Sequence, residues 1–538
     1  MNKTVTASAF ALALLCASLT ATPVSAAPYA VTEKSVAQLQ ADLTRGAVTS
    51  ETLVRAYLAR IEAIDRSGPA LHSIIAVNPQ ALAAARARDA ERRAGKVRGA
   101  LHGIPVLIKD NIESDDGTAT TAGSDALALN VTHRDAPLVK RLKAAGAIVL
   151  GKTNLSEWAN IRSSHSISGW SSRGGLVKNP YALDRNACGS SSGTGSAIAA
   201  SLAAVGVGTE TDGSVTCPSS INGLVGLKPT VGLVSRSRVV PISHTQDTPG
   251  PMGRSVADVA ALLSGIAGSD PADVATKDAD AHKRDYVAAL KGATLSGKRL
   301  GILKFATAGY PAREDALFAQ AVATLRAQGA TVIVLKDFKP DPKIGDDEDV
   351  VLLTELKADL NTYLASTPPS VTSRTLADLI AFNNTHPREL SIFGQETFKK
   401  AQGLGGLDDP KYVTARDDAK RLAGAEGIDK LILDNKLDAL IAPSYGPAYR
   451  TDVVAGDHIA GDSSGLPAVA GYPHLTVPMG YVLGMPVGIS FIGQAWSEAQ
   501  LLAIGAAYEK ATHLRHAPLY LPSIETSPDM APNLAPAK

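Results

Sequence analysis

Three segments of the sequence place amine or hydroxyl side chains in apolar or glycine-rich surroundings. Lys109 ends an apolar run, Ser190 lies in a serine- and glycine-rich stretch, and Ser214 directly follows a glycine. A lysine at the end of a buried strand costs free energy unless it is neutral or well hydrogen-bonded. A serine acts as a nucleophile when a nearby base takes its proton. Taken singly, however, each residue also has a structural explanation, as a lysine that reaches solvent, a loop residue or a turn residue.

A phosphate-loop pattern, G-x4-G-K-[ST], matches residues 146–153 letter for letter. A phosphate loop needs flexible residues between its glycines, so that backbone N–H groups can surround the phosphates. Here the intervening residues are Ala, Ile, Val and Leu, which are typical of a buried strand. A helical pattern also precedes the first glycine, where a strand should stand. We therefore expect no nucleotide site in this segment.

A second pattern, G-x-S-x-G, covers residues 189–193 with Ser191 at its centre. It matches the nucleophile elbow of α/β-hydrolases, which requires a strand immediately before it. The preceding residues 177–186 are polar and contain Pro180, so they do not predict a central strand. No downstream histidine is distinguished by its neighbours. An esterase of this type with Ser191 as its nucleophile stays open as a remoter alternative.

The three segments together resemble the amidase signature family. The resemblance extends over roughly residues 35–515, and 209–218 with 232–236 look most like the bacterial peptide amidases. Ser192 departs from the family's common pattern, which has glycine there. The stretches that carry the resemblance are 103–111, 188–196, 208–218, 222–230, 247–252 with Arg254, and 471–480.

The resemblance implies a catalytic triad in which Ser214 is the nucleophile, Ser190 relays the proton and Lys109 is the base. It also implies a cis peptide bond between Gly189 and Ser190. Lys109 must be neutral to accept a proton, and burial lowers a lysine pKa. We expect Asp110 to point away from it, because adjacent strand residues face opposite sides.

The same resemblance implies an oxyanion site made by successive backbone N–H groups of Thr211, Asp212, Gly213 and Ser214. The expected activity is hydrolysis of a carboxamide, foremost a peptide C-terminal amide, through an acyl-enzyme with release of ammonia. No metal or organic cofactor is implied. Aliphatic, aryl or fatty-acid amides remain alternative substrates, and an amide-binding protein without catalysis is a remote one. A component of a glutamine amidotransferase that acts on misacylated tRNA is disfavoured by the leader described below and by the balanced charge.

Apolar and amphipathic patterns alternate along the chain and predict an α/β fold with a mostly buried sheet. Amphipathic helices are expected at 50–63 and 135–145, a further helix at about 196–204, and a capping box at Ser497 predicts a final helix. The resemblance implies a large mixed sheet with helices on both faces. The expected strands are 104–108, 147–150, 300–303, 331–335, 439–442, 475–477 and 487–492.

One amidase-signature domain is expected over residues 27–520. Within it, the polar region 338–418 has few strand patterns and predicts a helical insertion that shapes a substrate cleft. Residues 521–538 contain Pro, Ser and Ala without periodicity and predict a flexible tail.

The first 26 residues have the three parts of a secretory signal peptide: Lys3, the apolar stretch 9–19, and small residues before a cleavage point after Ala26. We expect cleavage, export to the periplasm or the cell exterior, and no membrane contact afterwards. The 53 Lys and Arg residues nearly balance 52 Asp and Glu residues, so no nucleic-acid partner is expected. The sequence does not indicate an oligomeric state.

Two cysteines, Cys188 and Cys217, remain after such cleavage. They could pair in an oxidising compartment, or they could be two small buried apolar residues. We favour the second interpretation, because two cysteines in a large protein are not a disulfide framework. Their spacing does not indicate a zinc site.

Overall fold

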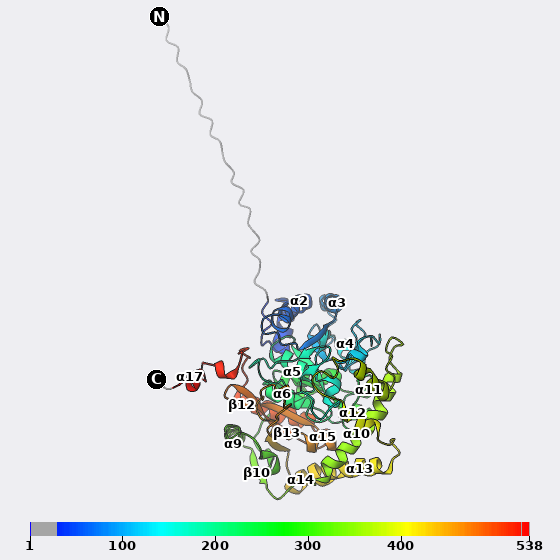
Figure 1. Cartoon of the computed structure of the whole chain (residues 1–538). Coiled ribbons are helices and arrows are strands. Elements are labelled where there is room, and N and C mark those ends of the chain that lie inside the picture. Colours follow the sequence, from blue (N-terminus) through cyan, green and yellow to red (C-terminus); the bar gives the residue numbers. More distant parts are fainter. Residues whose placement is uncertain (2–28, 529, 537–538) are drawn as a thin grey trace.

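A large mixed β-sheet runs through the molecule, with helices on both of its faces (Figure 1). The computed structural model describes residues 1, 29–528 and 530–536, so the expected signal peptide lies outside the described residues. The eleven strands of the sheet lie in the order β1-β3-β2-β6-β8-β7-β12-β13-β11-β9-β10. They are β1 Ile74–Val77, β2 Pro105–Lys109, β3 Ile148–Thr153, β6 Val205–Glu210, β7 Val225–Lys228, β8 Thr248–Gly253, β9 Arg299–Leu303, β10 Thr331–Leu335, β11 Ala439–Pro443, β12 His474–Val482 and β13 Met485–Ile492, and a separate pair is β4 Trp170–Ser171 with β5 Gly175–Leu176.

Helices follow most strands, as expected of an α/β chain. Two π-helical segments, Ile61–Arg66 and Arg421–Asp429, directly continue α2 and α13. The α-helices are α1 Val36–Thr44, α2 Ser50–Arg60, α3 Ala81–Arg93, α4 Pro137–Ala144, α5 Ser192–Ala199, α6 Thr216–Ile221, α7 Val256–Ile266, α8 Ala279–His282, α9 Ala312–Ala327, α10 Lys343–Ala365, α11 Leu376–Thr385, α12 Glu396–Gln402, α13 Pro410–Lys420, α14 Lys430–Asn435, α15 Gly465–Ala470, α16 Glu498–Thr512 and α17 Ala531–Leu534.

The centre of the sheet combines expected strands such as β2 with β6, β7 and β8, which were not among the expected strands. β2 pairs in parallel with β3 on one side and β6 on the other, and β6 pairs antiparallel with β8. Every residue of β2 and β6 is buried, because both faces of these strands are covered. All seven expected strands are confirmed. The strand interpretation of the phosphate-loop pattern is also confirmed, since its apolar residues belong to β3.

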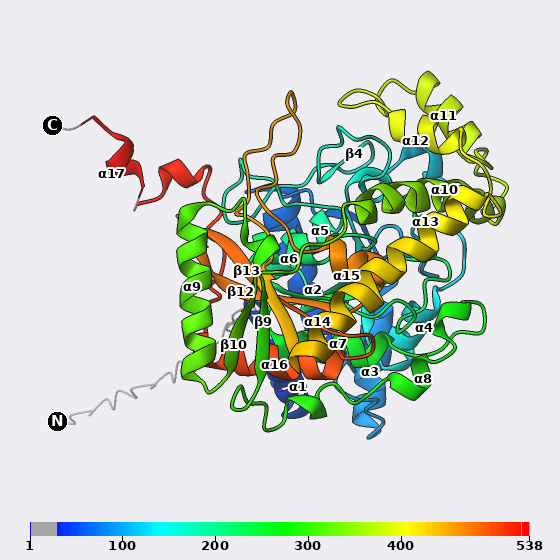
Figure 2. The same cartoon turned by 90° about the horizontal axis from the view of Figure 1, so that it is seen from below.

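The expected helical insertion is confirmed as helical. Helices α10, α11, α12 and α13 fill most of residues 338–418 and lie together on one side of the molecule, with α10 and α13 against α15 (Figure 2). No helix within the described residues combines the length and apolar character that a membrane crossing requires.

Four local predictions need correction. The helix expected at 50–63 is helical throughout, but it is an α-helix only to Arg60 and continues to Arg66 as a π-helix, and the helix expected at 196–204 spans Ser192–Ala199. The capping box at Ser497 does not form: its hydroxyl donates to the Gln494 carbonyl at 2.7 Å instead, although α16 does begin there.

The fourth correction concerns the expected tail, which begins as part of the packed structure. The Leu183 N–H donates to the Leu521 carbonyl at 2.8 Å, and Glu525 pairs with Arg185 at 2.8 Å. Ile524 is buried against the core. A run without periodicity can still be fixed by contacts with distant segments, which its sequence does not reveal.

Candidate functional site

Lys109 stands at the carboxyl end of β2 with no part of its side chain exposed. Its Nζ donates to Ser190 Oγ at 2.7 Å and to Thr209 Oγ1 at 2.9 Å, with the Thr209 carbonyl at 3.3 Å. Burial lowers the pKa of Lys109 to about 7, against the opposing charges of Asp247 and Glu210. The lysine can therefore be neutral near physiological pH, which is the state a base requires.

Ser190 lies just before α5, and the peptide bond between Gly189 and Ser190 is cis, as expected. Gly189 is closely packed, since a Cβ there would stand 2.2 Å from Ser156 Oγ and would displace that side chain. The Ser190 carbonyl accepts a hydrogen bond from the Ser156 N–H at 3.0 Å. These contacts fix the backbone that directs the Ser190 hydroxyl toward Lys109.

Ser214 lies in the turn between β6 and α6 and lines a cavity of about 380 Å³. The residue is 8% exposed, and its carbonyl accepts a hydrogen bond from the Ser191 N–H at 3.2 Å. Glu210 holds the following turn, because its carboxylate accepts from the Val215 N–H at 2.7 Å and the Thr216 N–H at 2.9 Å. The structure thus brings Lys109 and Ser190 into contact and places Ser214 at the cavity. Among the described residues no hydrogen bond joins the two serine hydroxyls.

The four residues 211–214 line the same cavity. Within the part of the chain that the structure describes, their backbone N–H groups donate to no protein acceptor. Gly213 has a φ of +76°, and a Cβ there would meet the Tyr445 hydroxyl at 2.2 Å. Its conformation and its close neighbour both require glycine. Unpaired N–H groups beside a nucleophile are the donors that an oxyanion needs.

Asp247 fixes this turn through a hydrogen bond with Thr211. None of the sequence predictions gives Asp247 a role. Its partly buried carboxylate accepts hydrogen bonds from Thr211 Oγ1 at 2.6 Å, the Ile242 N–H at 2.8 Å and the Ser243 N–H at 3.0 Å. Burial raises the pKa of Asp247 to about 6. The residue lies in the family-like stretch 247–252, and that position was the only signal in the sequence that could have pointed to it.

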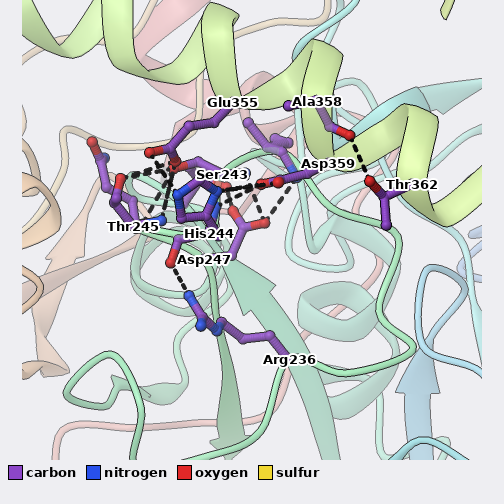
Figure 3. A network of polar contacts seen from close by, with 12 residues as sticks. Arg236, Ser243, His244, Thr245, Asp247, Glu355, Ala358, Asp359 and Thr362 are labelled. Carbon is purple, nitrogen blue, oxygen red and sulfur yellow. Dashed lines mark hydrogen bonds and ion pairs between the residues drawn. The ribbon is translucent and has the colours of Figure 1, made fainter. Parts of the chain in front are cut away.

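An ion-pair network ties this loop to α10 (Figure 3). His244 Nδ1 lies 2.9 Å from Asp359 Oδ2, and its Nε2 lies 3.3 Å from Glu355 Oε1. Three ligand atoms of these residues lie within 4.8 Å of one another, a spacing that a metal ion could use. Glu355 also accepts from the hydroxyls of Ser243 and Tyr412 at 2.5 and 2.6 Å. The carboxylates are thus already satisfied by protein donors, and the arrangement fits a clamp between α10 and the loop.

The amidase family profile matches residues 52–502 of the sequence. The chain belongs to this family. A peptide amidase from Stenotrophomonas maltophilia has 50% sequence identity and a TM-score of 0.86, with 91% of this chain and 99% of that chain covered. A peptide amidase in complex with the competitive inhibitor chymostatin has 51% identity and a TM-score of 0.87, with 90% and 99% covered.

Sequence relatives give the same assignment. A probable amidase of Arabidopsis thaliana is 41% identical over 505 residues, which cover 92% of this chain and 93% of that protein. Family membership and these relatives make the chain an amide-hydrolysing enzyme. Its mixed sheet with flanking helices is the amidase signature fold.

The remoter alternative for this amidase, Ser191 as an esterase nucleophile, does not fit the geometry. Ser191 is fully buried, and its hydroxyl both donates to the Thr209 carbonyl at 3.1 Å and accepts from the Thr209 N–H at 3.2 Å. No strand immediately precedes it among the described residues. Asp110, as expected, faces away from Lys109, toward Thr121, and burial raises its pKa to about 6.

The two cysteines of the amidase form a disulfide, so our preference for two unpaired cysteines is wrong. Cys188 and Cys217 are bonded across a Cα–Cα distance of 6.0 Å. Cys188 precedes the cis bond, and Cys217 lies in the first turn of α6 after Ser214. The bond therefore joins the two loops that carry Ser190 and Ser214. Spacing alone could not reveal this pairing, because it depends on how β6 and α6 bring these loops together.

Proposed function

We propose that the amidase hydrolyses peptide C-terminal amides with Ser214 as nucleophile, Ser190 as proton relay and Lys109 as base. The observation that carries this proposal is the contact between the fully buried Lys109 Nζ and Ser190 Oγ at 2.7 Å. A neutral amine in that place can take a proton from a hydroxyl, because burial has removed the solvation that favours its charged form. The position of Ser214 at the cavity supports its assignment as the attacking residue.

The proposed reaction has two halves. In the first, Ser214 Oγ bonds to the carbonyl carbon while its proton passes through Ser190 to Lys109. The oxyanion is stabilised by the N–H groups of residues 211–214, and loss of one such donor costs about 10²–10³ in rate. Lys109 then returns the proton through Ser190 to the leaving nitrogen, and ammonia departs. In the second half, a water molecule attacks the ester, and the same groups regenerate the Ser214 hydroxyl and release the acid.

The choice of a peptide amide as substrate is supported by the peptide amidases at 50–51% identity over almost their full length. The cavity supports it as well, since polar groups such as Asn160 and Ser168 line it beside Ile161 and Leu352. Leu352 belongs to α10, and we propose that the insertion at 338–418 shapes the cleft within a single domain of residues 27–520.

We further propose that the enzyme is exported to the periplasm or the cell exterior. The signal-peptide pattern at residues 1–26 and the Cys188–Cys217 disulfide support this, because disulfides persist in oxidising compartments. Expression of the full chain in a bacterial host, followed by fractionation and N-terminal sequencing, tests both points. Export with a new N-terminus at residue 27 is expected, and an intact chain in the cytosol would contradict it.

The substrate proposal is tested with purified enzyme and four compounds: a peptide amide, an aliphatic amide, an aryl anilide and glutamine. Ammonia release, or aniline release for the anilide, is followed for wild type and for the inactive control Ser214→Ala. We expect the peptide amide to give the highest kcat/KM. A clearly higher kcat/KM for any of the other three compounds would contradict the proposal and assign that compound's class as the substrate.

A further inference from the structure

One wall of the cavity beside Ser214 has an unusual backbone conformation. Trp158, Ala159 and Asn160 follow one another with φ angles of +52°, +53° and +76°. Residues other than glycine rarely adopt this left-handed conformation, and a run of three costs free energy at each position. Asparagine is among the residues that enter this region most readily. Ala159, Asn160 and Ile161 all line the cavity, so this left-handed turn lies where a substrate would bind.

Buried contacts on both sides hold the left-handed turn in place. Before and after it, Glu157 Oε1 lies 2.9 Å from Arg162 Nε, and neither side chain is exposed. The buried ring of Trp158 meets Phe398 of α12 edge-on, with 5.9 Å between the ring centroids. A strained backbone persists only where the surrounding structure enforces it. These contacts supply that enforcement and thereby fix the position of Asn160 in the cavity wall.

The side chain of Asn160 has no partner within the part of the chain that the structure describes. Its Oδ1 is inaccessible to solvent and accepts no hydrogen bond there. A buried acceptor without a donor costs free energy. Because the residue is only half-buried and lines the cavity, rotation about its last side-chain bond turns either end of the carboxamide toward a ligand. A carboxamide offers both donors and an acceptor, which is what a peptide group requires of its partner.

We propose that Asn160 is a specificity-determining residue whose carboxamide binds the peptide group that precedes the scissile C-terminal amide. This inference rests on the proposed function and adds the basis of its preference for peptides. An aliphatic amide has a carboxamide to cleave but no second amide group for Asn160 to bind. Ile161 and Leu352 in the same lining offer apolar surface to a side chain beside that group.

The proposed contact lies away from the bond that breaks. It therefore stabilises the bound substrate and the transition state alike, and its loss raises KM while kcat stays nearly the same. A merely structural role for Asn160 would instead lower the activity toward every amide, whether or not the substrate contains a peptide group.

A matched pair of substrates tests this assignment. Acetyl-leucine amide contains a peptide group, and its analogue carries a propyl group in place of the acetylamino group, with the same carboxamide and the same side chain. We expect wild type to hydrolyse acetyl-leucine amide with a kcat/KM about tenfold higher than that of the analogue. Asn160→Gly should bring this ratio close to one by raising KM for acetyl-leucine amide.

Glycine is the replacement of choice because it adopts the left-handed backbone without strain, so the turn can keep its shape. The matched control is Lys436→Gly, which changes an exposed residue with a φ of +51° outside the cavity lining. This control should leave the ratio unchanged. Asn160→Ala repeats the measurement if the glycine variant does not fold.

Equal kcat/KM values for the two substrates in wild type would overturn the assignment. A folded Asn160→Gly or Asn160→Ala variant that keeps the wild-type ratio would overturn it as well. The ammonia-release panel separates the two proposals. If its peptide amide is not hydrolysed, the proposed function fails, whereas hydrolysis of the peptide amide with a ratio that Asn160 does not control rejects this inference alone.

Discussion

At the scale of single residues, the site depends on how Lys109 is kept uncharged. Its Nζ has three contacts, all to Ser190 and Thr209, and none of them is a carboxylate. Asp247 and Glu210 act on it only as charges at longer range and oppose the effect of burial. Each unit of pKa shift corresponds to about 1.4 kcal/mol. The fold therefore gives up stability at this position, which fits the proposed role of Lys109 as a base.

Replacing Lys109 by methionine should stabilise the folded protein while it abolishes activity. The pKa of Lys109 in the folded state is about 7, below its ordinary value, so folding releases its proton. The resulting cost is full below about pH 7 and shrinks as the pH rises toward 10.5. After the lost bonds to Ser190 and Thr209 are counted, we expect a gain of about 1–3 kcal/mol at pH 7. Urea unfolding at several pH values measures it, and a gain that grows with pH would contradict the assignment.

The pH dependence of activity separates the two serines that sequence patterns offered as nucleophiles. Because the base must be neutral, kcat/KM should fall as the pH drops through about 7. Ser191→Ala should keep this acid limb and most of the activity, and should lose about 1–3 kcal/mol of stability because its bonds to Thr209 disappear. Steady-state kinetics of wild type and Ser191→Ala at pH values on both sides of 7 measures the acid limb and the remaining activity. If the Ser191→Ala variant were folded but inactive, Ser191 rather than Ser214 would be assigned as the nucleophile.

At the scale of elements, two loops are held together by contacts that span the chain. The Cys188–Cys217 disulfide joins the loop before α5 to α6, and Asp247 fixes the turn that carries Thr211. β2 was predictable, since it is a continuous apolar run, whereas β6 was not among the expected strands, because its glycines and its polar end interrupt the apolar pattern. The disulfide, Asp247 and Tyr445 were not predictable, because each acts through a partner that is near only in the fold. The local pattern at Ser497 also predicted a capping box that does not form, because the Ser497 hydroxyl donates to the Gln494 carbonyl instead.

Loss of the disulfide should destabilise the enzyme and reduce its activity together. Closing a loop with a sequence separation of 29 residues stabilises by about 3–4 kcal/mol in the chain-entropy description. The double variant Cys188→Ser/Cys217→Ser should show that loss in urea unfolding, with lower kcat because both loops carry proposed catalytic serines. Dithiothreitol should change neither the stability nor the kcat of this variant. In wild type, reduction should lower both quantities toward the values of the variant. Full activity after verified reduction would show that the bond does not position the site.

At the scale of the whole molecule, residues of the sheet and of the helical region 338–418 meet at the candidate site. β2 and β6 carry Lys109 and Thr209 side by side, while α10 brings Leu352 to the cavity and anchors to the 243–247 loop through His244 (Figure 3). The overall α/β architecture and the helical insertion were predictable from periodicity. The packing of the last segment was not, because residues 521–527 contain no pattern that shows what they contact.

Truncation distinguishes the packed part of this segment from the rest. Ending the chain after Ser527 keeps buried Ile524 and the Glu525–Arg185 pair and serves as the reference. Ending it after Tyr520 removes buried Ile524 and the Glu525–Arg185 pair, and should cost about 2 kcal/mol or more. Differential scanning calorimetry of both truncated enzymes provides the comparison. Equal melting temperatures for the two would show that residues 521–527 add nothing to stability.

The most direct test of the central claim is the site and rate of labelling by a fluorophosphonate, which reacts covalently with an activated serine hydroxyl. Peptide mapping by mass spectrometry should find the label on Ser214, and its rate in wild type should fall as the pH drops through about 7. In Lys109→Ala the rate should fall by about 10² or more. A label on Ser191, or an unchanged rate at Ser214 in folded Lys109→Ala, would contradict the account.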